Sequence, residues 1–123
     1  MKVLLSIKPE FANKIFDGSK KFEFRRLVFK NKDVKKIVVY ASAPISKVIG
    51  EFDVDEVLYR DIDDLWNDTK EHSGITKDYY ESYFVGKEKG YAIKVKNSKR
   101  YAKDYCLMSR YGVKPPQSFL YLR

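Results

Sequence analysis

The feature that most constrains the fold of this chain is a series of strand-like segments that recur along most of its length. The clearest is KKIVVYAS (35–42), which is rich in β-branched residues. KVIGEFDVDEVLYR (47–60) predicts a second long strand, with Gly50 as a candidate bulge. KVLLSI (2–7) predicts a buried strand, and GYAIKVK (90–96) predicts another. The chain is therefore expected to be built around a small sheet.

The sequence also predicts a helix that begins near Pro9 and two shorter strands, one after this helix and one at the end of the chain. Pro9 suits the first turn of a helix, and Gly18 follows where a helix end favours a left-handed residue. KKFEFRR (20–26) alternates in the manner of a strand, and PPQSFLYLR (115–123) begins extended and ends as a last strand.

The acidic middle of the chain predicts two further short helices, over residues 61–74 and 75–86. Thr76 can cap the second of these helices, which carries an aromatic stripe of tyrosine and phenylalanine. About six strands and about three short helices predict an α+β domain, built on a small, curved, mixed sheet or barrel.

Length and composition narrow the class of protein. A chain of 123 residues with 44% hydrophobic residues fits one compact domain, here predicted to be residues 1–123. The single cysteine excludes a disulfide framework. No apolar run approaches the roughly 20 residues of a membrane span, and the N-terminal apolar segment is short for a signal peptide. We therefore expect a cytoplasmic protein without membrane contact.

Charge is distributed unevenly along the chain, whose net charge is +8. Residues 20–36 carry a net charge of +6, residues 51–81 carry −8, and residues 82–123 carry +8. This division predicts one basic and one acidic face, and the basic face would attract a polyanion such as a nucleic acid. Basic proteins that bind no nucleic acid are nevertheless common.

Several kinds of catalytic site lack the residues that they require. His72 and Cys106 are the only histidine and cysteine, and neither stands at a ligand spacing, so we expect no metal or cofactor. A magnesium site built from carboxylates alone stays open at this point. The glycines form no phosphate-binding loop of the dinucleotide or P-loop type.

The segment FDGSKKFEFRR (16–26) crowds four basic residues around one glutamate. Alternation along a strand turns Phe22 and Phe24 inward. Glu23 and Arg25 then project together on an exposed or cleft-lining face.

Lys20 can join Glu23 only if it still belongs to the turn that follows Gly18. A desolvated lysine in such a turn would have a lowered pKa and could act as a base or a nucleophile. A salt-bridged strand edge, whose charges discourage aggregation, explains the same residues equally well.

The spacing Gly18-x-Lys20-x-x-Glu23-x-Arg25 resembles the G-x-K-x-x-E-x-R signature of the ASCH domain, a member of the PUA-like superfamily. The order of the other segments agrees: a short helix before the glycine, then YASAPISKVIGEF (40–52), YFVGKEKGYAIKV (83–95) and a closing PPQSF. The chain is similar over its whole length to small bacterial, archaeal and phage ASCH proteins that are often described as predicted transcriptional regulators.

This resemblance implies a PUA-like β-barrel with flanking helices, in which the signature residues line a cleft for RNA or a modified nucleoside. Some ASCH proteins are amidohydrolases that remove the acetyl group from N4-acetylcytidine, and another is described as a ribonuclease. In the amidohydrolases a lysine that matches Lys20 acts on the amide. A threonine stands where this chain has Glu23, and a glutamate falls near Glu71.

The leading hypothesis is a module that binds RNA or a nucleotide-like ligand, with a role in regulation or RNA metabolism; DNA stays possible. The residues expected to bind the base are Lys20, Glu23 and Arg25, with Ser42 at the cleft floor and Tyr83 as a stacking ring. The residues expected to bind phosphates are Lys21, Arg26, Lys30 and Lys32. Ser42 could equally be an ordinary strand-end residue. The aromatic stripe of Tyr79, Tyr80, Tyr83 and Phe84 has helical spacing, which is more typical of core packing than of a binding surface.

The alternative hypotheses are hydrolysis of an acylated cytidine, cleavage of RNA, and protein binding through the acidic segment 51–81. In the amidohydrolase hypothesis, Lys20 is the base or nucleophile, Glu23 orients it and Glu71 shuttles a proton.

Overall fold

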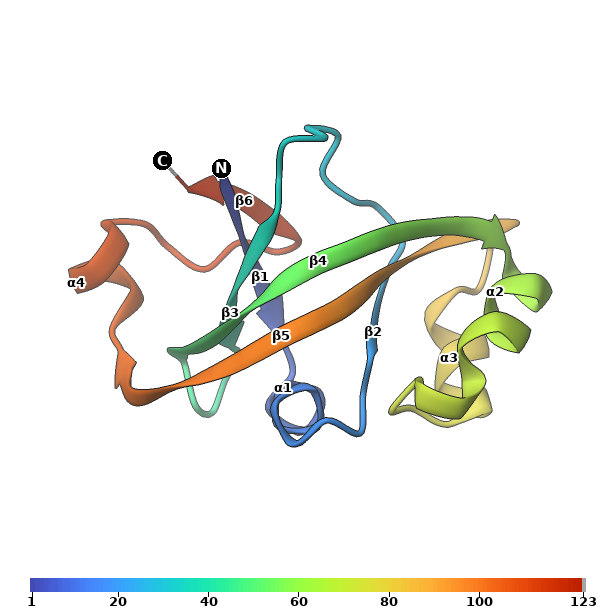
Figure 1. Ribbon diagram of the computed structural model, residues 1–123, viewed down its shortest axis with the longest axis horizontal. Helices are drawn as coiled ribbons and strands as arrows, with labels where there is room; N and C mark the ends of the chain where they lie inside the picture. Colours follow the sequence, from blue (N-terminus) through green and yellow to red (C-terminus); the bar gives the residue numbers. More distant parts are fainter. Residues whose placement is uncertain (123) are drawn as a thin grey trace.

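The computed structural model describes residues 1–122, which form a six-stranded sheet with short helices around it (Figure 1). The elements follow in the order β1 (Lys2–Ile7), α1 (Pro9–Asp17), β2 (Phe22–Arg25), β3 (Lys36–Ala41), β4 (Lys47–Asp61), α2 (Ile62–Thr69), the 3₁₀ helix η1 (Lys70–His72), α3 (Lys77–Tyr83), β5 (Lys89–Tyr105), α4 (Leu107–Tyr111) and β6 (Phe119–Leu122). The predicted α+β class is confirmed. Among the described residues there are four α-helices rather than about three.

The sheet is mixed and open, with the strand order β2-β5-β4-β3-β1-β6. β1 pairs in parallel with β3, and every other neighbouring pair of strands is antiparallel. The predicted small mixed sheet is confirmed, but the barrel that the resemblance implies is not closed, because within residues 1–122 the short edge strands β2 and β6 do not pair with each other.

The sheet nevertheless curls until its two ends approach. Three strands separate β2 from β1 in the sheet order. Even so, Nη2 of Arg25 in β2 donates a hydrogen bond of 2.8 Å to the carbonyl oxygen of Ser6 in β1. A side chain thus spans the place where strand pairing would close a barrel. We call this place the seam.

Local signals set the ends of the helices beside the seam. Helix α1 begins at Pro9 and ends before Gly18, whose φ of 88° lies in the left-handed region that glycine adopts without strain. Helix α3 is capped by Thr76, whose Oγ1 accepts a hydrogen bond of 3.1 Å from the backbone N–H of Tyr79. Both predicted helix signals are confirmed.

The predicted irregularity at Gly50 is also present. The register between β3 and β4 shifts opposite this residue, and the register between β4 and β5 shifts there as well. A Cβ atom on Gly50 would lie 2.5 Å from the ring of Phe16 and 2.6 Å from the carbonyl oxygen of Lys99. The lack of a side chain at Gly50 therefore lets the ribbon of β4 and β5 pass closely over helix α1.

Two features exceed the predictions. Strand β5 continues to Tyr105, well beyond residue 96, because its polar second half pairs with the first half of β4. The short helix α4 lies beyond the end of β5, at the opposite end of the molecule from α2 and α3 (Figure 1).

The core is divided among three clusters of buried side chains. The first lies between helix α1 and the inner face of the curled sheet. The second joins β2, β4 and β5 to helices α2 and α3, and contains Phe22 and Phe24, as the alternation of this strand predicts. The third lies where β1, β3 and β4 meet helix α4.

Within residues 1–122, no helix combines the length and apolar character that crossing a membrane requires.

Candidate functional site

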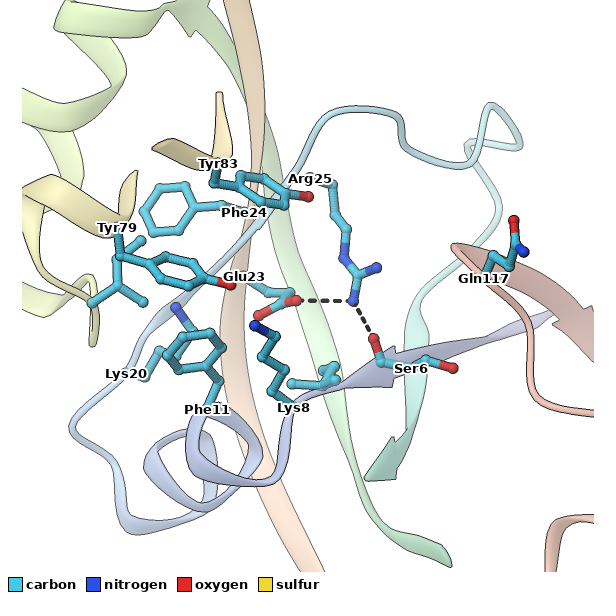
Figure 2. A pocket seen from close by; sticks show the side chains of 12 residues that line it. Ser6, Lys8, Phe11, Lys20, Glu23, Phe24, Arg25, Tyr79, Tyr83 and Gln117 are labelled. Atoms are coloured by element: carbon cyan, nitrogen blue, oxygen red, sulfur yellow. Dashed lines mark hydrogen bonds and ion pairs between the residues drawn. The ribbon is translucent and has the colours of Figure 1, made fainter. Parts of the chain in front are cut away.

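A cavity of about 270 Å³ lies at the seam, between helix α1, strand β2 and helix α3. Its lining combines three charged signature residues with aromatic rings and the end of β1, as Figure 2 shows. The lining residues are Ser6, Ile7, Lys8, Phe11, Lys20, Glu23, Phe24, Arg25, Ile75, Tyr79, Tyr83 and Gln117.

Lys20 lies in the turn between α1 and β2, and its side chain is only 1% exposed. Its Nζ donates a hydrogen bond of 2.6 Å to the carbonyl oxygen of Ser73. The rings of Phe11 and Phe24 lie 5.3 and 5.0 Å from this nitrogen, measured to their centroids. Burial lowers the pKa of Lys20 to about 8, and the nearby charge of Glu23 opposes part of that shift.

Glu23 and Arg25 form a buried ion pair on strand β2. Nη2 of Arg25 lies 2.9 Å from Oε2 of Glu23, and the two residues are 9% and 6% exposed respectively. The prediction that these side chains project together is confirmed, and the face lines a cleft rather than open solvent.

The guanidinium of Arg25 also reaches across the seam. Besides Ser6, it contacts the carbonyl oxygen of Ser118 through Nη1, at a long distance of 3.4 Å. Its buried Nε has no hydrogen-bond partner among residues 1–122. Arg25 therefore holds the seam together and keeps hydrogen-bonding capacity in reserve.

Helix α3 supplies an aromatic wall to the cavity. The rings of Tyr79 and Tyr83, one helical turn apart, are nearly parallel, with an angle of 10° between their planes. The ring of Phe11 meets Tyr79 edge-on at 5.1 Å, and Nζ of Lys8 lies 5.2 Å from the Tyr79 centroid. Burial raises the pKa of Tyr83. Such a wall can stack a planar ligand.

Tyr79, Phe11 and Lys8 were not predicted to belong to the site. The aromatic stripe of α3 indicated core packing, and that interpretation is correct for Tyr80 and Phe84, which are buried. The i, i+4 spacing of Tyr79 and Tyr83 is the signal that could have placed both rings on another face.

Other predicted site residues lie outside this cavity. Lys21 and Glu71 line a separate hollow of about 400 Å³, together with His72. The structure thus does not place Glu71 in the cavity with Lys20. Ser42 follows β3, where its backbone N–H donates to the carbonyl oxygen of Ile7, and it is not among the cavity residues.

The remaining predicted phosphate contacts are exposed. Nη1 of Arg26 donates to the carbonyl oxygens of Tyr83 and Val85, at 2.8 and 2.9 Å, beside the cavity. Lys30 and Lys32 line another hollow, between the segment after β2 and strand β4. Within the described part of the chain, no group of three or more histidine, cysteine, aspartate or glutamate side chains is placed to hold a metal ion.

Residues 5–100, which include the whole cavity except Gln117, match the ASCH domain family. The chain belongs to the ASCH domain family. The ASCH resemblance is thereby confirmed, and the fold is PUA-like with an open seam instead of a closed barrel.

This ASCH domain is similar to a protein of Zymomonas mobilis named "ASCH domain-containing ribonuclease". The two are 30% identical over 123 residues, which cover 98% of this chain and 83% of that protein. The crystal structure of ASCH from Zymomonas mobilis superposes with a TM-score of 0.91 at 30% identity, covering 99% of this chain and 87% of the other.

Two further similarities are more limited. A protein of Ureaplasma parvum named "Large ribosomal subunit protein uL22" is 32% identical over 122 residues. These residues cover 98% of this chain, so the chain spans only 39% of the length of that relative. The N-terminal domain of McrB from Staphylothermus marinus has a TM-score of 0.51 at 12% identity, which shows a similarity of fold alone.

Proposed function

We propose that this ASCH domain binds RNA and that the seam cavity receives one nucleobase. The observation that carries the proposal is the combination of the buried cluster Lys20, Glu23 and Arg25 with the aromatic wall of α3. The cavity volume of about 270 Å³ falls just below the roughly 300–1,000 Å³ that is usual for drug-sized ligands. This size suits a single base better than a larger molecule.

The polar side of the cavity offers both hydrogen-bond donors and a hydrogen-bond acceptor. Oε2 of Glu23 is engaged by Arg25, so the carboxylate can accept a base N–H through its other oxygen. The Lys20 ammonium and the Arg25 guanidinium can donate to base carbonyls or ring nitrogens. Unstacked bases of single-stranded RNA are read in this way, with their faces held on aromatic rings.

Exposed cations at the two ends of β2 suit the phosphate backbone. Lys21 comes directly before β2 and Arg26 directly after it, and both are exposed. Arg26 lies beside the cavity, whereas Lys21 lines the separate hollow that contains Glu71. We expect Lys21→Ala and Arg26→Ala to weaken RNA binding similarly for all sequences. Each should lower the slope of log K against log salt by about 0.7, the value for one phosphate contact on a single strand.

The test is fluorescence anisotropy with short single-stranded RNA at several salt concentrations. Tyr79→Ala should weaken binding by about 1–3 kcal/mol, the usual value for one stacked base. Unchanged salt slopes in both cation variants would show that Lys21 and Arg26 do not contact the RNA phosphates. Full affinity in Tyr79→Ala would show that the base does not enter the cavity. The same titration with DNA decides between the two nucleic acids.

The second candidate function is cleavage of RNA. It is favoured by the Zymomonas mobilis relative, which is named a ribonuclease and matches nearly all of this chain. Here the 2′-hydroxyl would attack the adjacent phosphorus and lose its proton to Glu23, while the 5′-oxygen would leave with a proton from the Lys20 ammonium. Arg25 would stabilise the charge on the phosphoryl oxygens.

End-labelled RNA distinguishes binding from cleavage. Fragments that end in a 2′,3′-cyclic phosphate, and that disappear in both Lys20→Ala and Glu23→Gln, would support cleavage. Intact RNA under conditions that give saturated binding would make this domain a binding module.

Hydrolysis of an acylated cytidine stays a third possibility. It requires proton transfer between Lys20 and Glu71, which line different hollows. Turnover of N4-acetylcytidine, followed by mass spectrometry in wild type and Lys20→Ala, tests it directly. A regulatory role and a cytoplasmic location also remain predictions.

A further inference from the structure

The cavity at the seam does not end at Arg25. A second hollow of about 430 Å³ lies on the other side, and its wall includes Arg26, Leu27 and Lys87. The two hollows share Arg25, Tyr83 and Gln117 as lining residues. They therefore form two compartments of one groove, which we call the inner and the outer compartment.

The shared boundary carries a cation with unused hydrogen-bonding capacity. The Nη2 of Arg25 is fully engaged by Glu23 and Ser6, but its Nη1 makes only the long contact of 3.4 Å to Ser118. Its Nε donates to no acceptor within residues 1–122 but is itself buried, so the loosely held Nη1 is the donor left for a ligand. A guanidinium N–H of this kind is well suited to an anionic oxygen such as that of a phosphodiester.

The outer compartment has the chemistry of a nucleotide site. Arg26 and Lys87 are exposed, and Leu27 presents a side chain that is 65% exposed. Lys87 has no ion-pair partner in the described part of the chain, while Arg26 is fixed by the backbone carbonyls of Tyr83, at the end of α3, and of Val85, just after it. A free nucleoside in the inner compartment would leave all these groups unused.

We propose that the ligand of this groove is a single-stranded oligonucleotide of at least two nucleotides rather than a free nucleoside. One base occupies the inner compartment, the linking phosphate lies at Arg25, and the next nucleotide lies over Leu27 with its backbone near Lys87. This inference rests on the proposed function, because it assumes that the inner compartment takes a base. A duplex does not suit the groove, since its bases are stacked and paired.

The experiment is isothermal titration calorimetry at low salt with the four nucleosides, their 3′- and 5′-monophosphates, and the four matching homodinucleotides. The dinucleotides carry 2′-O-methyl groups, because these block attack by the 2′-oxygen and prevent cleavage during the titration. We expect the best dinucleotide to bind at least about tenfold more tightly than its monophosphates, a gain of ~1.4 kcal/mol.

Lys87→Gln isolates the outer compartment. It should weaken dinucleotide binding by about two- to fivefold, the loss typical of one exposed charge pair, and leave monophosphate binding unchanged. Lys103→Gln is the matched control, because Lys103 is also exposed and lies twelve positions beyond Tyr91 on β5, away from the groove. Both variants lose one positive charge, so a general electrostatic effect would appear equally in both.

The outcomes separate this inference from the proposed function. Equal affinities for monophosphate and dinucleotide, or an equal loss for both ligands in Lys87→Gln, would overturn the two-compartment groove and leave the base-binding cavity intact. Failure of every nucleoside, nucleotide and RNA to bind would overturn the proposed function, and the inference with it.

Discussion

Replacing Lys20 with methionine removes one buried ammonium while keeping most of the side-chain volume. Since burial lowers the pKa of Lys20 from 10.5 to about 8, keeping this residue charged in the folded protein costs about 3 kcal/mol near pH 7. Removing the charge recovers this free energy, but the variant also loses the hydrogen bond to Ser73, which offsets about 1–3 kcal/mol of the recovered stability. The variant should therefore be as stable as wild type near pH 7, or slightly more stable.

The sign of the pH dependence follows from the two pKa values. Below pH 8 the folded and unfolded states both bind the proton, so the full cost of burial is present. Between about pH 8 and pH 10.5 the folded state releases the proton while the unfolded state keeps it, so wild-type stability rises with pH. The methionine variant lacks this gain. Its free energy of unfolding relative to wild type should fall by about 2.5 kcal/mol between pH 7 and pH 10.

Urea denaturation followed by circular dichroism, at a series of pH values, measures this difference directly. Titration of the other lysines and of the tyrosines is common to both proteins and cancels. Lys21→Met is the matched control, because it removes an exposed ammonium from the neighbouring residue. A difference between Lys20→Met and wild type that stays constant from pH 7 to pH 10 would refute a desolvated lysine at the cavity wall.

Two further predictions concern the packing around the site. Gly74→Ala should destabilise the protein by about 1–3 kcal/mol more than Gly86→Ala in urea denaturation, because both glycines have positive φ but only at Gly74 would a Cβ meet Lys20, at 2.6 Å; equal losses would contradict it. Tyr80→Phe should cost about 1 kcal/mol and lower the melting temperature, because the Tyr80 hydroxyl donates to the carbonyl oxygen of Ile62 at 2.6 Å. An unchanged melting temperature would show that this bond contributes nothing.

Sequence reasoning succeeded where the cause is local. The cap at Gly18 depends on one residue and its own φ, and the cap at Thr76 depends on an oxygen three positions before its donor. The inward turn of Phe22 and Phe24, and the pairing of their neighbours on β2, follow from the two-residue period of a strand.

It left alternatives open, or missed the feature, where contacts between distant segments determine the structure. The sequence offered a desolvated Lys20 as only one of two explanations, because its burial depends on the loop of Ser73 and Gly74, more than fifty positions away. The bridge that Arg25 makes across the open seam depends on carbonyl oxygens of two other segments, which no local pattern reveals. The second half of β5 contains few strand-forming residues, and its pairing with β4 overrides that weak preference.

The ladder of β1 and β6 has a consequence for the order in which the protein folds. Lys2 is paired with Leu122, so these two strands come from opposite ends of the described chain. Contacts between such distant positions form slowly, because the chain loses the entropy of closing a long loop before any contact between the two strands stabilises it. Arg25 needs Ser118, just before β6, to complete its contacts. We therefore expect the groove to be among the last regions to assemble during folding. It should also be among the first to open in native-state hydrogen exchange, while the β3–β4–β5 core stays closed.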